Sequence, residues 1–126
     1  MSWLSRLKAA RGGAQALSAQ AEHTLRTWHA LPDAVLDHPH FESRYVVVNT
    51  EATGLDLDSD RLLAVGAVGV DGGLLHPTDA YYATLDPAPG EALAGLLGVL
   101  GKSPLVVFNA SFNRSMLERA LNEHLG

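Results

Sequence analysis

The chain has 126 residues, a formal net charge of −5, a calculated pI near 5.6 and 47% apolar residues. This length fits one globular domain of about 100–150 residues and excludes a multidomain assembly. The lack of cysteine excludes disulfides, thiolate zinc sites and cysteine nucleophiles. Nine Lys and Arg against fourteen Asp and Glu argue against a general nucleic-acid binder, which needs clustered positive charge.

Hydropathy argues against a membrane protein. No apolar run approaches the roughly 18 residues of a transmembrane helix, and the N-terminus lacks the continuous apolar stretch of a signal peptide. We therefore expect a soluble, cytoplasmic protein with no membrane partner.

The first part of the chain predicts a helical arm of slight positive charge, because residues 1–44 sum to +1 and residues 45–126 to −6. Apolar side chains at steps of three and four fall on one helical stripe: Trp3, Leu7, Ala10, Ala14, Leu17, Ala21, Leu25 and Trp28. Gly12-Gly13 weakens the stripe by about 1 kcal/mol per glycine relative to Ala, so one helix and two shorter helices are alternatives. We assign the arm to residues 1–30 and a linker to residues 31–44.

Three strands are predicted next. The β-branched run from Arg44 to Asn49 is typical of a strand buried on both faces. Arg61–Val70 predicts a second strand, and Asp71-Gly72-Gly73 predicts a hairpin turn. Leu74–Leu85 predicts a third strand, broken by His76-Pro77.

The last part of the chain alternates helix and strand. Glu91–Leu100 has leucines at helical spacing, and Gly101 stands where a helix C-cap is expected. Pro104–Phe108 predicts a fourth strand and Ser111–Leu125 a final helix. Residues 45–126 therefore predict an α/β domain with the order β-β-β-α-β-α and a mixed sheet.

Two motifs stand at fixed places in this order. The first, Asn49-Thr50-Glu51-Ala52-Thr53-Gly54, stands at the end of the first strand. The second, Phe108-Asn109-Ala110-Ser111-Phe112-Asn113, joins the fourth strand to the last helix. They resemble the Asp-x-Glu-Thr-Thr-Gly and His-Asn-x-x-Phe-Asp motifs of DnaQ-like (DEDD) 3′–5′ exonucleases, the family of the DNA polymerase III epsilon subunit. The resemblance covers about residues 45–126 and implies a ribonuclease H-like three-layer fold, here truncated.

The resemblance implies a two-metal nuclease site. Two Mg²⁺ or Mn²⁺ ions about 4 Å apart activate a water and stabilise the leaving oxygen, and such hard cations need carboxylates. The family supplies four, at positions 49, 51 and 113 and on a late helix that also carries the general base. The resemblance further assigns nucleic-acid contacts to Thr53, Gly54, Asn109 and Phe112.

The chain departs from this site at most positions. Asn49 and Asn113 replace aspartates, Phe108 replaces histidine, and Glu51 remains. Thirteen residues follow Asn113, with one histidine, His124, so the late helix has no place. We therefore predict a catalytically inactive domain with a vestigial site at Asn49, Glu51, Asn113 and Phe108. Glu51 is expected to bind metal weakly, and Mg²⁺ or Mn²⁺ to be weakly held or absent.

The missing fifth strand and final helix of the family leave residues 104–108 as an open sheet edge. Such an edge is a template for pairing with another chain. The arm, residues 1–30, is the expected cover, either on its own domain or on a neighbour. We therefore predict a homodimer formed through this edge or through the arm.

Three functions follow as alternatives. The first is an interaction or self-association module, and the second is a weak metal-dependent 3′–5′ exonuclease on single strands. The third is a passive single-strand binder, with phosphate contacts and stacking residues drawn from Arg114, Arg119, Lys102, Tyr81, Tyr82 and Phe108. The acidic charge of residues 45–126 argues against the third.

An acidic loop after the first motif resembles the start of a calcium loop. Asp56, Asp58 and Asp60 have the required spacing, but the sixth position is Arg61 and the twelfth is Ala67. We interpret it as a solvated acidic loop.

Overall fold

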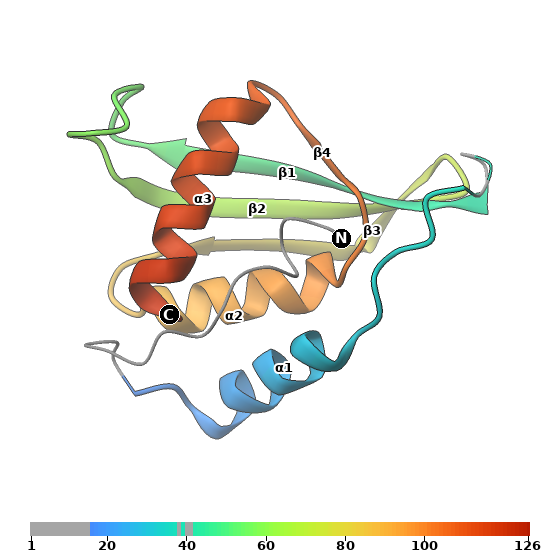
Figure 1. Ribbon diagram of the computed structural model, residues 1–126, viewed down its shortest axis with the longest axis horizontal. Coiled ribbons are helices and arrows are strands. Elements are labelled where there is room, and N and C mark those ends of the chain that lie inside the picture. The colour runs from blue at the N-terminus through green and yellow to red at the C-terminus, as the bar shows by residue number, and fades with distance from the viewer. Residues whose placement is uncertain (1–15, 38, 40–41) are drawn as a thin grey trace.

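The computed structural model describes residues 16–37, 39 and 42–126, and its elements follow the predicted order (Figure 1). The elements are α1 (Ala19–Ala30), β1 (Arg44–Ala52), β2 (Leu62–Asp71), β3 (Leu74–Thr84), α2 (Pro89–Leu100), β4 (Leu105–Val107) and α3 (Ala110–His124). The α/β class and the β-β-β-α-β-α order are confirmed. β1 continues past Asn49 to Ala52, so most of the first motif lies within the strand.

The four strands form one mixed sheet in the order β3-β2-β1-β4. β1 pairs antiparallel with β2, where Val47 lies opposite Val68, and parallel with β4, where Val47 lies opposite Val106. β2 pairs antiparallel with β3. Among the described strands β4 pairs with β1 alone, as predicted for an edge strand, but it covers only Leu105–Val107 of the predicted residues 104–108.

The β2–β3 hairpin contains the predicted turn but not the predicted break. Gly72 and Gly73 have φ of 58° and 80°, the conformation that a two-residue type I′ turn requires. β3 runs on through Pro77. The register shifts between Val68 and Val70, and residues 76–79 have no partner on β2, so the missing amide hydrogen of Pro77 removes no ladder hydrogen bond.

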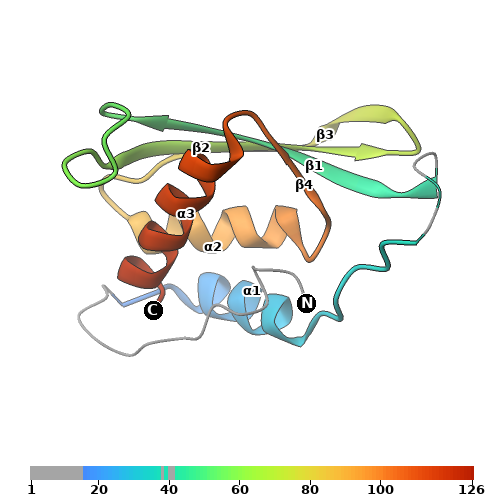
Figure 2. The same cartoon turned by 45° about the horizontal axis from the view of Figure 1, so that its top comes forward.

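The helices of the described chain cover one face of the sheet (Figure 2). Side chains alternate between the two faces along a strand, so Val46 and Val48 are buried under the helices while Val47 is 37% exposed on the other face. α2 lies between the sheet and α1, where Leu93 and Leu96 are fully buried. The core therefore lies between the sheet, α2 and α3, and α1 is an outer helix that packs on α2.

α1 packs on its own chain through both of its ends. The Ser18 backbone amide and hydroxyl donate to the Glu91 carboxylate at the start of α2, at 2.5 and 2.9 Å. At the other end Trp28 is buried, and its indole nitrogen donates to the Gly101 carbonyl at 2.7 Å. From the described part of the predicted arm, Trp28 thus belongs to the same core as the sheet, and Leu25 packs against that core. The remaining stripe positions, Trp3, Leu7, Ala10 and Ala14, and the Gly12-Gly13 pair lie outside the described residues.

Candidate functional site

The start of α3 contacts β1 at the residue between the motif positions Asn49 and Glu51. The Thr50 hydroxyl donates a hydrogen bond to the side-chain oxygen of Asn113, in the first turn of α3. The two motifs are more than fifty residues apart in the sequence. The structure nevertheless brings them together at the carboxyl end of β1.

The side-chain amide of Asn113 both accepts and donates hydrogen bonds. Its oxygen accepts from Thr50, and its nitrogen donates to the carbonyls of Phe108 at 2.6 Å and Asn109 at 3.3 Å. An ionised carboxylate has no hydrogen to donate and would place negative charge against two carbonyl oxygens. The surroundings of position 113 therefore match an amide and not the aspartate of the family motif.

Asn109 turns the chain from β4 into α3. Its φ of 52° and ψ of 59° lie in the left-handed region, which asparagine tolerates better than most residues. Its carbonyl accepts the backbone amide of Asn113 at 3.2 Å, and its side chain makes no capping bond. The role visible for Asn109 is thus a turn residue that positions Asn113.

Asn49 and Glu51 face away from Thr50. Alternation along β1 places both side chains, which are exposed, on the sheet face that carries no described helix. The Glu51 carboxylate accepts from the Tyr82 hydroxyl at 3.5 Å. The two β1 positions and Asn113 therefore point to opposite faces of the sheet. Within the described part of the chain, no three His, Asp or Glu side chains gather as a metal site would require.

Some aromatic side chains near the motifs are exposed to solvent, and others are packed or hydrogen-bonded within the fold. Phe108 is 94% exposed and Tyr82 is 62% exposed, whereas Phe112 is half-buried. Tyr81 lies on the helix-covered face and donates its hydroxyl to the Ala92 carbonyl at 2.8 Å. Burial, together with the nearby Glu91 carboxylate, raises the pKa of Tyr81. Stacking on a base is thus open to Phe108 and Tyr82 but not to Tyr81.

Thr53 and Gly54 close the β1–β2 loop on Asp60. The Thr53 hydroxyl donates to the Asp60 carboxylate at 2.8 Å, and the Asp56 backbone amide donates to the same carboxylate at 2.8 Å. A Cβ at Gly54 would lie 2.5 Å from an Asp60 carboxylate oxygen, closer than such atoms approach. Both residues of the first motif therefore have a structural role in this loop.

The acidic loop gives a prediction for low pH. The Asp58 backbone amide donates to the Asp56 carboxylate at 2.9 Å, and this hydrogen bond, followed by one from Ser59, lowers the pKa of Asp56. A lowered pKa contributes stability above the unfolded value, which is lost as pH falls through the folded value. We expect the Asp58 amide resonance in an NMR titration to move with a midpoint below that of an unstructured aspartate. A midpoint at or above that value would contradict this hydrogen bond.

The three cations predicted to contact phosphate are engaged by the protein itself. Arg119 of α3 donates to the carbonyls of Leu57 and Asp60 and so ties the loop to the helix. Arg114 pairs with Glu118 at 3.1 Å. The Lys102 ammonium lies 4.2 Å from the centroid of the Trp28 ring.

Two structural contributors escaped the sequence reasoning. Thr50 stands at the x position of the first motif, where no role was expected, and strand alternation was the signal that it faces α3 rather than the open face. Arg119 was interpreted as a phosphate contact. Its link to the β1–β2 loop joins residues 59 and 62 positions apart, and nothing in the sequence indicates that pairing.

Comparison of the chain with protein-family models and with curated proteins finds no match. The described residues contain no helix that is both long and apolar enough to span a bilayer.

Proposed function

We propose that this chain is a non-catalytic, DnaQ-like domain of ribonuclease H-like type that self-associates through the edge of β4. One observation above all supports the proposal: β4 pairs with no second described strand, and residues 103–113 carry no charged side chain. The loss of catalysis is supported by the resemblance of the two motifs and by the surroundings of Asn113.

The outer edge of β4 offers backbone groups to a partner. The Val46 amide donates to the Pro104 carbonyl at 3.1 Å, so residues 104, 106 and 108 direct their backbone groups toward β1. Leu105 and Val107 then direct their amides and carbonyls away from the sheet. No backbone bond joins these outward groups to another described segment. Unpaired groups of this kind are a template for strand pairing.

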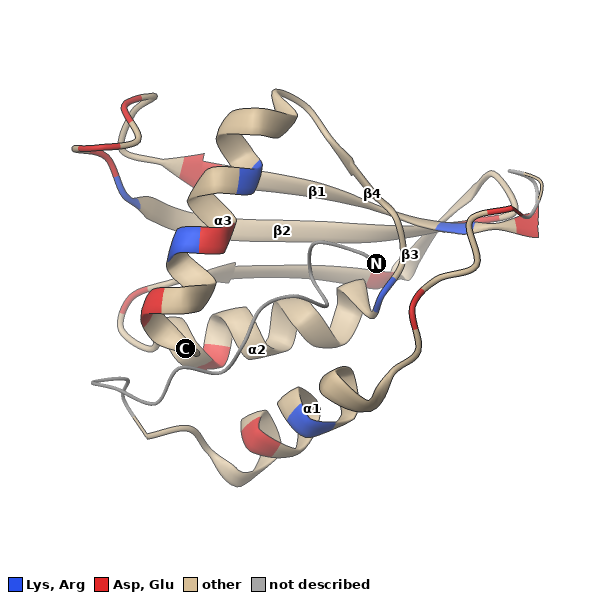
Figure 3. Cartoon of the chain, in the orientation of Figure 1, with Lys and Arg blue, Asp and Glu red and all other residues tan. Residues whose placement is uncertain are grey.

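The edge lacks one of the features that protect edge strands, which is charge, although β4 is only three residues long and follows Pro104. Residues 103–113 contain no charged side chain, as the uncoloured ribbon of β4 and the first turn of α3 shows (Figure 3). Val106 is 50% exposed and Phe108 is 94% exposed. The opposite edge, β3, carries Pro77 and an Asp79 that pairs with Arg44, and both discourage strand addition.

The edge is self-complementary in one antiparallel register. Centred on Val106, the pairing joins Leu105 to the partner subunit's Val107 and Val107 to the partner subunit's Leu105, with both backbone bonds made in each pair. The two Val106 side chains then face each other on the open face. A second copy brings no like charge to this contact, because the edge has none.

A charge exchange at Val106 tests this arrangement. We expect Val106→Lys and Val106→Asp each to be monomeric by sedimentation velocity at micromolar concentrations at which the wild type is a dimer. Like charges directly opposite each other destabilise a strand pair. An equimolar mixture should form the mixed dimer, detectable by native mass spectrometry.

The matched controls are Leu55→Lys and Leu55→Asp, since Leu55 is 79% exposed on the β1–β2 loop. They should leave the dimer intact. A monodisperse wild-type monomer at these concentrations would overturn self-association, and a mixture that stays monomeric would overturn the register.

The loss of catalysis is tested separately with a 3′-labelled single-stranded oligonucleotide and Mn²⁺. We expect fluorescence anisotropy that does not fall over hours with highly purified protein. Cleavage that Glu51→Ala abolishes would instead establish a metal-dependent exonuclease.

A further inference from the structure

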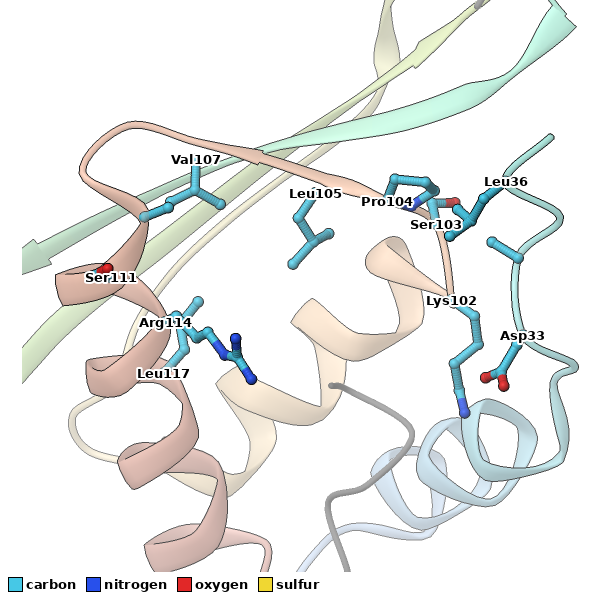
Figure 4. Close-up of a pocket in the computed structure, with 12 residues that line it drawn as sticks. Asp33, Leu36, Lys102, Ser103, Pro104, Leu105, Val107, Ser111, Arg114 and Leu117 are labelled. Carbon is cyan, nitrogen blue, oxygen red and sulfur yellow. The ribbon is translucent and has the colours of Figure 1, made fainter. Parts of the chain in front are cut away.

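A cavity of about 510 Å³ lies below β4, between α3, the end of α2 and the segment after α1 (Figure 4). Its volume falls within the range of about 300–1,000 Å³ that small-molecule sites occupy. Leu105, Val107 and Leu117 give it an apolar wall, and Lys102, Arg114 and Ser111 are among its polar lining residues. The cavity is thus built for a molecule with an apolar body and a polar end.

Lys102 is the one buried charged side chain in the described part of the chain, at 8% exposure. Its ammonium contacts the Trp28 ring, and no hydrogen bond or ion pair joins it to a described residue. Its side-chain nitrogen is not among the fully buried polar atoms that lack a partner, so the ammonium stays accessible to a ligand. An anion in the cavity would offer it the opposite charge that the described residues do not.

A second cation faces Lys102 across the cavity. Arg114 reaches in from α3 on the side opposite Lys102, and it pairs with Glu118 of the same helix (Figure 4). Ser111 adds a hydroxyl in the first turn of α3, a turn that contains no acidic residue. Helix N-termini favour negative charge because their amides point outward. Asp33 is the one acidic side chain among the described lining residues, and it does not form an ion pair with Lys102.

We propose that this cavity binds a small organic carboxylate with an aliphatic tail, whose carboxylate pairs with Lys102 and whose tail packs on Leu105, Val107 and Leu117. The site rests on no part of the proposed self-association. It is therefore tested on the Val106→Lys variant as well as on the wild type.

Octanoate is the probe, followed by NMR on the backbone amides of Leu105 and Ser111 and the indole N–H of Trp28. We expect saturable shifts at these three groups, and none from acetate or 1-octanol, which each lack one half of the proposed ligand. Lys102→Met keeps the aliphatic stem over Trp28 and should weaken binding roughly tenfold or more, the effect of one charged hydrogen bond. Asp33→Asn should strengthen binding, because it removes the carboxylate beside the bound anion.

The matched control is Arg26→Met, which removes an exposed cation from α1 outside the cavity and should bind octanoate as the wild type does. Equal binding of 1-octanol, or unchanged affinity in Lys102→Met, would overturn the proposal. So would shifts confined to groups outside the cavity.

Discussion

Replacing Trp28 with alanine is expected to lower the free energy of unfolding by about 3–5 kcal/mol, the range for large aromatic residues in cores. Trp28 is 2% exposed and belongs to the cluster that includes Val46 of β1 and Leu97 of α2. Loss of the Trp28 side chain would leave a cavity between α1 and α2 and remove the hydrogen bond to the Gly101 carbonyl. It would also remove the cation–π contact of the Lys102 ammonium. Urea denaturation followed by circular dichroism measures the change.

Two variants make this prediction specific. Trp28→Phe keeps most of the ring but not the indole N–H, so it should cost less than alanine, with the lost hydrogen bond alone worth about 1 kcal/mol. Leu55→Ala changes a side chain that is 79% exposed and should stay within about 0.5 kcal/mol of the wild type. If Trp28→Ala lost no more than Leu55→Ala, the docking of α1 on α2 would be wrong.

The fold was largely predictable because each element has a strong local pattern. The run at residues 45–48 and the leucines of α2 carry the periods of a strand and a buried helix, and Gly72 and Gly73 carry the chemistry of their turn. The continuous course of β3 was not predictable. Proline inside a strand usually marks a break, because it cannot donate a ladder hydrogen bond. Here the register shift leaves Pro77 without a partner on β2, so no hydrogen bond is lost.

The candidate site was less predictable because it depends on which way side chains face. The motifs correctly indicated that the end of β1 and the start of α3 belong together, as the Thr50–Asn113 contact shows. Residue identity alone did not indicate that Asn49 and Glu51 face the open side while Asn113 bonds to the covered side. The burial of Lys102 is likewise a product of tertiary packing, since lysines are seldom buried and no local pattern marks this one.

Replacing Asn113 with aspartate is expected to destabilise the protein by about 1–3 kcal/mol at neutral pH, although the change restores the residue of the family motif. The new carboxylate would face the carbonyls of Phe108 and Asn109, which now receive hydrogen bonds from the amide. The loss should shrink in acid, because a protonated carboxyl regains one donor. Asn49→Asp is the matched control, since the same chemical change on the exposed face should cost little.

The double variant Asn49→Asp, Asn113→Asp tests whether Asn113 has a structural role or is a metal ligand that has lost its negative charge. We expect no Mn²⁺-dependent cleavage of a 3′-labelled single strand, because positions 49 and 51 face one side of the sheet while position 113 is held against Thr50 on the other. Urea denaturation of the two single variants should show the loss of stability for Asn113→Asp alone. Cleavage by the double variant would mean that the side chains at positions 49, 51 and 113 bind the same metal site. It would also mean that the two asparagines are the reason the wild type is inactive.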